Sequence, residues 1–83
     1  MARIRSGYRG NLMHVSIAGR LTTADMGRLE HACSPALTRH PANLELDLRR
    51  VTYADATAIA VIRRIVQRGA RIINHSGLPI ERE

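Results

Sequence analysis

The side chains that perform catalysis or bind metals are few in this sequence, and their arrangement fits neither task. The four histidines lack the short spacings typical of metal sites: His14, His31, His40 and His75. The chain has no glycine-rich phosphate loop and no Gly-x-Ser-x-Gly motif. Asp47 and Asp55 could suggest a carboxylate pair, but Asp47 falls in an expected strand and Asp55 at an expected helix start. We therefore expect a protein that is not an enzyme and that has no cofactor.

The single cysteine, Cys33, lies on the apolar stripe of an expected helix and has no partner for an internal disulfide. A buried structural thiol is therefore favoured over a nucleophile.

No apolar run approaches the roughly 20 residues of a membrane span, and no signal-peptide stretch follows the N-terminus. The 83 residues are enough for one domain only. We expect a single cytoplasmic domain over residues 1–83, without membrane insertion.

The charge balance is strongly basic, with 13 arginines and lysines against seven acids and a net charge of +6. Arg3, Arg5 and Arg9 alternate along the first expected strand, and such a stripe could follow the phosphates of a nucleic acid. Glu45 and Asp47 could lie on the same face, where ion pairs would use part of the stripe. The two tyrosines do not make a stacking platform for bases. Nucleic-acid binding is therefore kept only as an alternative.

The N-terminal segment is expected to form a β-hairpin. Residues 3–18 alternate in character on both sides of a turn expected at residues 8–11, and Met13, Val15 and Ile17 share one side. A helix is expected next, because Thr22 or Thr23 can act as its N-cap.

Apolar residues recur at helical spacing in this expected helix: Met26, Leu29, Cys33 and Leu37. Asp25 lies three residues after Thr22, where its negative charge favours the positive end of the helix. Pro35 lacks an N–H and predicts either a kink or a break, with Ser34 capping a short second piece. We expect the helical segment to end before Pro41.

The second half of the chain predicts a strand, a helix and a last strand. Leu44, Leu46 and Leu48 alternate with acids, which indicates a strand buried on one face only. Asp55 is suitably placed as the N-cap of a helix that reaches Gly69. The buried stripe of that helix is expected to contain Ile59, Ile62 and Val66. A strand at residues 70–74 completes the order β-β-α-β-α-β, whose last strand-helix-strand unit implies parallel pairing.

Three segments of this pattern resemble the STAS domain, the fold of bacterial anti-sigma factor antagonists. Residues 15–22 are similar to the family's strand followed by Gly-x-Leu and usually Asp. Residues 46–59 look like its strand, loop and Asp-Ser-Ser-Gly-Leu helix start, and they carry the most specific part of the match. The third segment includes Gly69, the strand residues 71–73 and Pro79.

The resemblance implies an α/β fold of the STAS (SpoIIAA-like) type, with a mixed sheet and helices packed mainly on one face. Family members usually continue with a further helix, strand and helix, which this chain of 83 residues lacks. An uncovered strand edge invites pairing with another chain. We therefore expect a homo-oligomer or an obligate partner.

The resemblance also places a docking surface at the second helix start. The second serine of Asp-Ser-Ser-Gly is the residue that a partner anti-sigma kinase phosphorylates, and Thr57 occupies its position. Ala56 replaces the first serine and Ala58 replaces the glycine. Thr22 stands where the family commonly has Asp. The residues expected to bind the partner are Thr22, Tyr53, Asp55, Ala56, Thr57, Ala58 and Ile59.

The partner implied by the resemblance is an anti-sigma factor with a serine/threonine kinase fold. A different role within the family is that of a small subunit docked on the ATPase of a phospholipid-trafficking ABC transporter. The same helix start would then serve as the contact, without phosphorylation. Alternatively, Thr57 is an ordinary first-turn threonine and Asp55 an ordinary cap.

Overall fold

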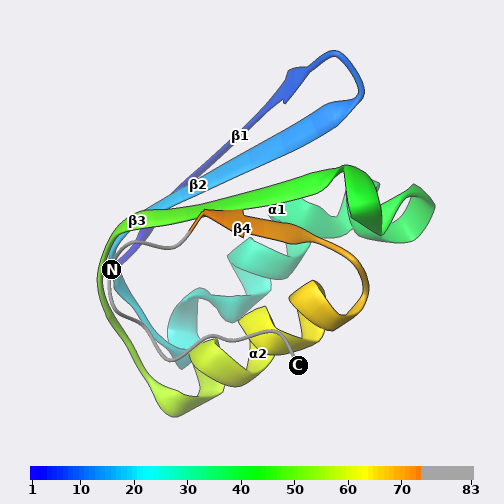
Figure 1. The fold of residues 1–83 in the computed structure, drawn as a ribbon. Coiled ribbons are helices and arrows are strands. Elements are labelled where there is room, and N and C mark those ends of the chain that lie inside the picture. The colour runs from blue at the N-terminus through cyan, green and yellow to red at the C-terminus, as the bar shows by residue number, and fades with distance from the viewer. Residues whose placement is uncertain (74–83) are drawn as a thin grey trace.

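A four-stranded sheet carries two helices on one of its faces in the computed structural model, which describes residues 1–73 (Figure 1). The elements in chain order are β1 (Arg3–Arg9), β2 (Leu12–Leu21), the 3₁₀ helix η1 (Thr23–Asp25), α1 (Met26–Arg39), the 3₁₀ helix η2 (Pro41–Asn43), β3 (Leu44–Ala54), α2 (Ala56–Gln67) and β4 (Arg71–Ile73). The strands lie in the order β1-β2-β3-β4. β1 pairs antiparallel with β2, whereas β2 with β3 and β3 with β4 are parallel. The predicted order β-β-α-β-α-β is confirmed.

The hairpin at the N-terminus closes through a two-residue turn. Arg9 pairs with Leu12, so only Gly10 and Asn11 connect the strands. Gly10 has a φ of 61°, a left-handed conformation that glycine adopts without steric cost. The turn is therefore shorter than the expected span of residues 8–11, and β1 and β2 extend to its edges.

The core lies between one face of the sheet and the two helices. Met13, Val15 and Ile17 of β2, which were predicted to share one side of the strand, are all buried. In β3, Leu44, Leu46 and Leu48 are each 0% exposed. The helices contribute these buried residues: Met26, Leu29, Cys33 and Ala36 from α1, and Ala58, Val61, Ile62, Ile65 and Val66 from α2. Because both helices pack on the same side, the alternate residues of the strands face the open side of the sheet (Figure 1).

The proline in the first helix does not divide it. Helix α1 runs from Met26 to Arg39 with Pro35 inside, so of the two expected outcomes, a kink or a break with Ser34 as a second cap, the break is wrong. Pro35 is exposed, while Cys33 and Ala36 on its two sides are buried. Burial of these neighbours holds the helix together, since most helix stability in proteins comes from packing of the apolar face.

The segment that follows Leu48 is strand, although the resemblance predicted a loop there. β3 continues to Ala54 and pairs with β2 as far as Leu21. The pairing register shifts twice along these two strands, between Ser16 and Ala18 and between Gly19 and Arg20. Such irregularities let a long strand bend while it stays paired. The last predicted strand is confirmed at β4, whereas Asn74, Pro79 and the rest of residues 74–83 lie outside the described residues.

A buried carboxylate ties the N-terminus to the first helix. Asp25 is 1% exposed and accepts hydrogen bonds from the backbone N–H of Thr22 at 2.9 Å and from the Arg28 guanidinium. Arg28 also donates to the carbonyl oxygen of Ala2, at 3.0 Å. Burial by itself would raise the pKa of Asp25, but these hydrogen bonds outweigh it and the pKa lies below its ordinary value of 3.8.

We expect Asp25→Asn to lower the free energy of unfolding at pH 7 by about 2 kcal/mol, because a buried charged acceptor is lost. The folded-state pKa of Asp25 is depressed, so its contribution is complete above the unfolded pKa and is lost as the pH falls through the folded pKa. The difference between the two proteins should therefore shrink below about pH 4. Urea unfolding at pH 7 and pH 3 measures it, with Glu30→Gln on the exposed side of α1 as control. Equal stability of Asp25→Asn and wild type at pH 7 would contradict this role.

Candidate functional site

The carboxylate of Asp55 joins two chain segments that are 32 positions apart. Its Oδ1 atom accepts the backbone N–H of Ala58 at 2.9 Å, which caps helix α2 as the sequence predicted. Its Oδ2 atom accepts both the backbone N–H of Thr23 at 2.9 Å and the Thr23 hydroxyl at 3.1 Å. The backbone N–H of Asp55 donates to the carbonyl of Leu21 at 3.2 Å. The end of β2 and the start of α2 therefore form one surface.

These hydrogen bonds also set the charge of Asp55. The N–H groups of Ala58 and Thr23, together with the Thr23 hydroxyl, stabilise the ionised carboxylate and lower its pKa below 3.8. At neutral pH the surface therefore carries a fixed negative charge next to the first turn of α2.

Thr57 lies in that first turn and is exposed. Helix α2 begins at Ala56, so Thr57 is its second residue, in the part of a helix where backbone N–H groups have no partner inside the helix. Ala56 is exposed beside it, and Ile59 is half-buried against the core. The hydroxyl of Thr57 is thus accessible to another protein at a position favourable to negative charge.

An aromatic residue and an arginine border this turn. Tyr53 is 43% exposed, and the Arg20 guanidinium lies 4.4 Å from the centre of its ring. The two residues are paired across β2 and β3. A cation at this distance from an aromatic face is attracted to it. We call the surface formed by the following residues the docking face: Thr22, Tyr53, Asp55, Ala56, Thr57 and Ile59.

One residue differs from its expected place. Ala58 is 0% exposed, so its side chain lies in the core and not at the docking face. The cause is helical geometry, because Ala58 shares the buried side of α2 with Ile62. Thr22 is half-buried and is the N-cap of η1, where it is engaged with Asp25.

Two residues of this region were not predicted from the sequence. Thr23 was considered only as a helix cap, but it bonds to Asp55 instead. Arg20 was not singled out, because its place opposite Tyr53 depends on the register shift next to Gly19. The side-chain types alone give no signal for either contact.

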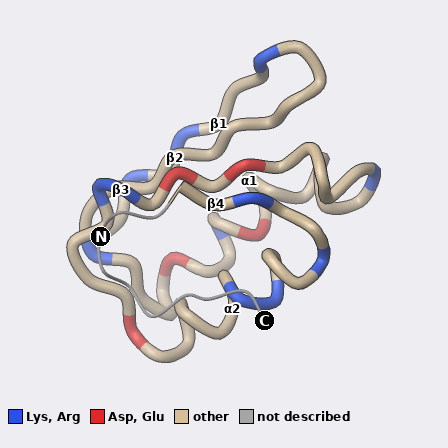
Figure 2. The backbone as a smooth tube through the Cα atoms, in the orientation of Figure 1, with Lys and Arg blue, Asp and Glu red and all other residues tan. Residues whose placement is uncertain are grey.

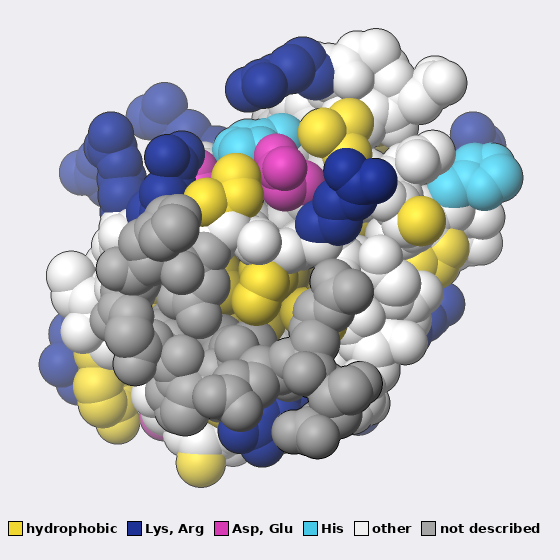
Figure 3. Space-filling model, in the orientation of Figure 1, with side chains coloured by type: hydrophobic (Ala, Val, Ile, Leu, Met, Phe, Trp, Pro, Cys, Tyr) yellow, Lys and Arg dark blue, Asp and Glu magenta, His cyan; other side chains and the backbone are white. Residues whose placement is uncertain are grey.

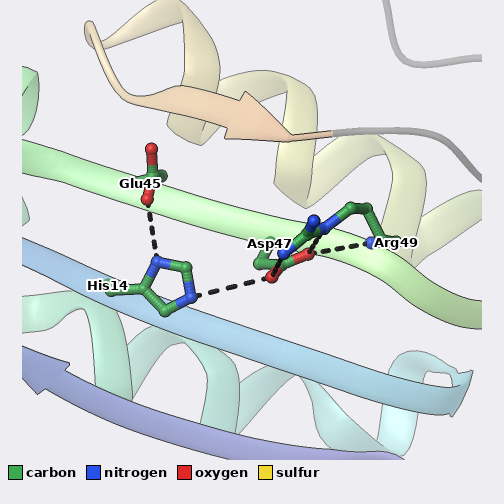
Figure 4. Close-up of polar contacts among 4 residues, drawn as sticks. All are labelled: His14, Glu45, Asp47 and Arg49. Carbon is green, nitrogen blue, oxygen red and sulfur yellow. Dashed lines mark hydrogen bonds and ion pairs between the residues drawn. The ribbon is translucent and has the colours of Figure 1, made fainter.

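A second polar cluster lies on the open face of the sheet (Figure 4). His14 Nδ1 lies 2.8 Å from Glu45 Oε1, and its Nε2 lies 3.7 Å from Asp47 Oδ2. Arg49 donates to both oxygens of Asp47, through Nε at 3.0 Å and Nη2 at 2.8 Å. The Arg49 hydrogen bonds lower the pKa of Asp47 to about 2. The acids do share a face with the arginine stripe, but their partners in residues 1–73 are His14 and Arg49 and not the arginines of β1.

Cys33 is buried in the core of the structure, as its place on the α1 stripe predicted. Burial raises the pKa of its thiol to about 11.

Residues 1–73 contain no group of three or more His, Cys, Asp or Glu side chains placed to hold a metal ion. In the same part of the chain, no helix has the length and apolar character needed to cross a membrane.

Comparison with known proteins identifies the family. The family model described as "Mlab, STAS domain" matches residues 5–78. A crystal structure of a protein called Mglu superimposes with a TM-score of 0.62 at 18% identity, over 89% of this chain and 20% of that one. A protein of the DUF3478 family from Shewanella loihica, described as having a SpoIIAA-like fold, gives a TM-score of 0.52 at 14% identity, over 89% of this chain and 66% of that one. No curated protein matches the chain.

These two structures show the same fold as this chain, which spans less than two thirds of either of them.

Two substitutions separate the roles of the Asp55 carboxylate. Asp55→Asn keeps one oxygen to cap α2 but loses the acceptor for Thr23, whereas Asp55→Ala loses both. We expect the thermal unfolding temperature at pH 7 to fall in the order wild type, Asp55→Asn, Asp55→Ala. Because the folded-state pKa is depressed, the gap between wild type and Asp55→Asn should close as the pH falls through that pKa. Circular dichroism melts measure both effects, and identical melting of all three proteins would contradict the bridging role.

Proposed function

This chain belongs to the STAS domain family, and we propose that it is a cytoplasmic protein-interaction module whose docking face binds an anti-sigma factor with a serine/threonine kinase fold. The observation that carries the proposal is the exposed first turn of α2, fixed by Asp55 to the end of β2. A rigid, solvent-facing turn can bind a partner with little loss of conformational entropy. Binding, and not catalysis, is the proposed role.

The residues around the turn suit a protein interface. Tyrosine and arginine are enriched among the residues that dominate binding energy, and Tyr53 and Arg20 lie together at this surface. Ala56 is exposed in the first turn, and Ile59 adds a half-buried apolar side chain. A partner can thus bury an aromatic anchor next to the helix start.

Phosphorylation of Thr57 is the proposed switch. A phosphate adds about −1.5 to −2 charges at neutral pH. The positive end of α2 tolerates that charge within its own helix. A partner surface built against a neutral hydroxyl, with the carboxylate of Asp55 already next to it, would lose binding through repulsion and desolvation. The switch acts on docking and leaves the fold in place.

A second candidate role is docking on the ATPase of a phospholipid-trafficking ABC transporter. Two residues favour it: Ala56 and Ala58 replace the serine and glycine of the phosphorylated motif. Because Ala56 takes the place of the first serine, the first turn of α2 offers a partner the hydroxyl of Thr57 and not a pair of hydroxyls. In this role the same docking face works without phosphate.

The two candidates give different results with three variants. If Thr57 is the switch, Thr57→Asp should weaken binding to the purified kinase-fold partner at least about tenfold, while Thr57→Ala binds like wild type. Incubation with that kinase and ATP should place a phosphate on Thr57 in wild type, detected by mass spectrometry. Thr38→Asp, an exposed change of equal charge on α1, is the control and should bind normally.

Equal binding of the partner by Thr57→Asp and Thr57→Ala would reject the phosphorylation switch but would still agree with the docking face as the binding surface. Copurification with an ABC ATPase, lost on Tyr53→Ala and unaffected by Thr57→Asp, would establish the second role instead. Unchanged binding of every partner by Tyr53→Ala would reject the docking face itself.

A further inference from the structure

The open face of the sheet contains a hollow of about 380 Å³, on the side away from both helices. Arginines from two strands form its walls, and small side chains from the strand between them form its floor. The residues that matter here are Arg3, Arg5, Ser16, Ala18, Arg49 and Arg50. Figure 2 shows arginines gathered at this end of the sheet, and Figure 3 shows basic side chains next to the His and acidic side chains.

A bulge in β3 places two consecutive arginines on this face. Leu48 and Val51 are both buried, whereas Arg49 and Arg50 between them are exposed. The register confirms an extra residue, because Ser16 pairs with Asp47 while Ala18 pairs with Arg50. In a regular strand only one of two neighbours would face the open side.

Ala18 sits in the middle of a row that crosses three strands. It pairs with Arg3 of β1 on one side and with Arg50 of β3 on the other. Since neighbouring strands are about 4.8 Å apart, the two arginine backbones are separated by about 10 Å across the small alanine. Two guanidinium groups can therefore reach over Ala18 from opposite sides. Arg5 stands in the next row, opposite Ser16.

The charges of this hollow are not balanced. Arg49 is bonded to Asp47. For Arg3, Arg5 and Arg50, the described part of the chain provides no ion pair. Asp47, a carboxylate in the lining, is thus engaged by Arg49, and three cations remain around one concave surface. Such a surface raises the local concentration of anionic ligands.

We propose that this hollow binds a compact phosphate-bearing ligand, held by Arg3, Arg5 and Arg50 over the floor formed by Ser16 and Ala18. Guanidinium groups form paired hydrogen bonds with phosphate oxygens, and a ligand with two or three negative charges matches the three free cations. A phosphate monoester or a diphosphate has this charge.

A long polyanion fits the face less well. Asp47 lines the hollow and is paired with Arg49, and Glu45 lies on the same face outside it; both carboxylates would repel a backbone that continues past the hollow. The lining of the hollow also contains no tyrosine, phenylalanine or tryptophan for base stacking. The arrangement therefore favours a single phosphate or diphosphate group over a nucleic acid.

Titration of the whole chain with inorganic pyrophosphate, followed by NMR and calorimetry, tests the proposal. Pyrophosphate should shift the signals of Arg3, Arg5, Ala18 and Arg50. Arg50→Gln should weaken binding by about tenfold, because a charge-assisted pair is lost. Arg9→Gln removes an equal charge from the same strand β1 outside the hollow and should bind like wild type. Ala18→Glu, which puts a carboxylate on the floor, should abolish binding while the circular dichroism spectrum stays unchanged.

Vesicles containing phosphatidic acid, compared with neutral phosphatidylcholine vesicles, identify the source of the phosphate. Binding of free pyrophosphate indicates a soluble ligand, whereas binding of the phosphatidic acid vesicles alone, lost in Arg50→Gln, indicates a lipid headgroup. Absence of both, or equal weakening by Arg9→Gln and Arg50→Gln, would overturn the proposal. So would tighter binding to duplex DNA than to pyrophosphate, with a steep dependence on salt.

Discussion

The carboxylate of Asp55 is the contact on which the functional surface depends. One oxygen caps helix α2 through Ala58, and the other holds Thr23 at the end of β2. Strand pairing and the bond from the Asp55 N–H to the Leu21 carbonyl hold the end of β2 near α2, and the carboxylate adds the link to Thr23, beyond the end of the strand. Because both oxygens are used, the first turn of α2 and the segment after β2 keep one relative position. Thr57 is therefore presented on a surface with a defined shape and charge.

One-sided packing of the helices divides the molecule into surfaces with different chemistry. The leucines of β3 fill the core, and the alternate residues Glu45 and Asp47 face the open side. The docking face lies where β2 and β3 lead into their helices, whereas the arginine hollow lies on the open face a few residues earlier on the same strands. A protein partner and a small anion could consequently bind the chain without competing for the same atoms.

Local sequence patterns predicted the elements and part of the site. Alternation identified β3, and the residue type at position 55 identified the cap of α2. Contacts that depend on the register between β2 and β3 could not be predicted from the sequence. Arg20 lies against Tyr53, and Arg49 and Arg50 share a face, because the pairing of these two strands contains irregularities that no local pattern encodes. At Pro35 a local signal was present but did not decide the structure. The proline favours a break in the helix, but the burial of Cys33 and Ala36 keeps α1 continuous.

An NMR pH titration of the Asp55 carboxyl carbon and of the backbone amides of Thr23 and Ala58 tests the bridge most directly. We expect all three signals to move with one midpoint, which lies below pH 3.8, and both amide responses to disappear in Asp55→Asn. A response of Ala58 with an unresponsive Thr23 would show that Asp55 is only a helix cap. The docking face would then lack the link that gives it a fixed shape.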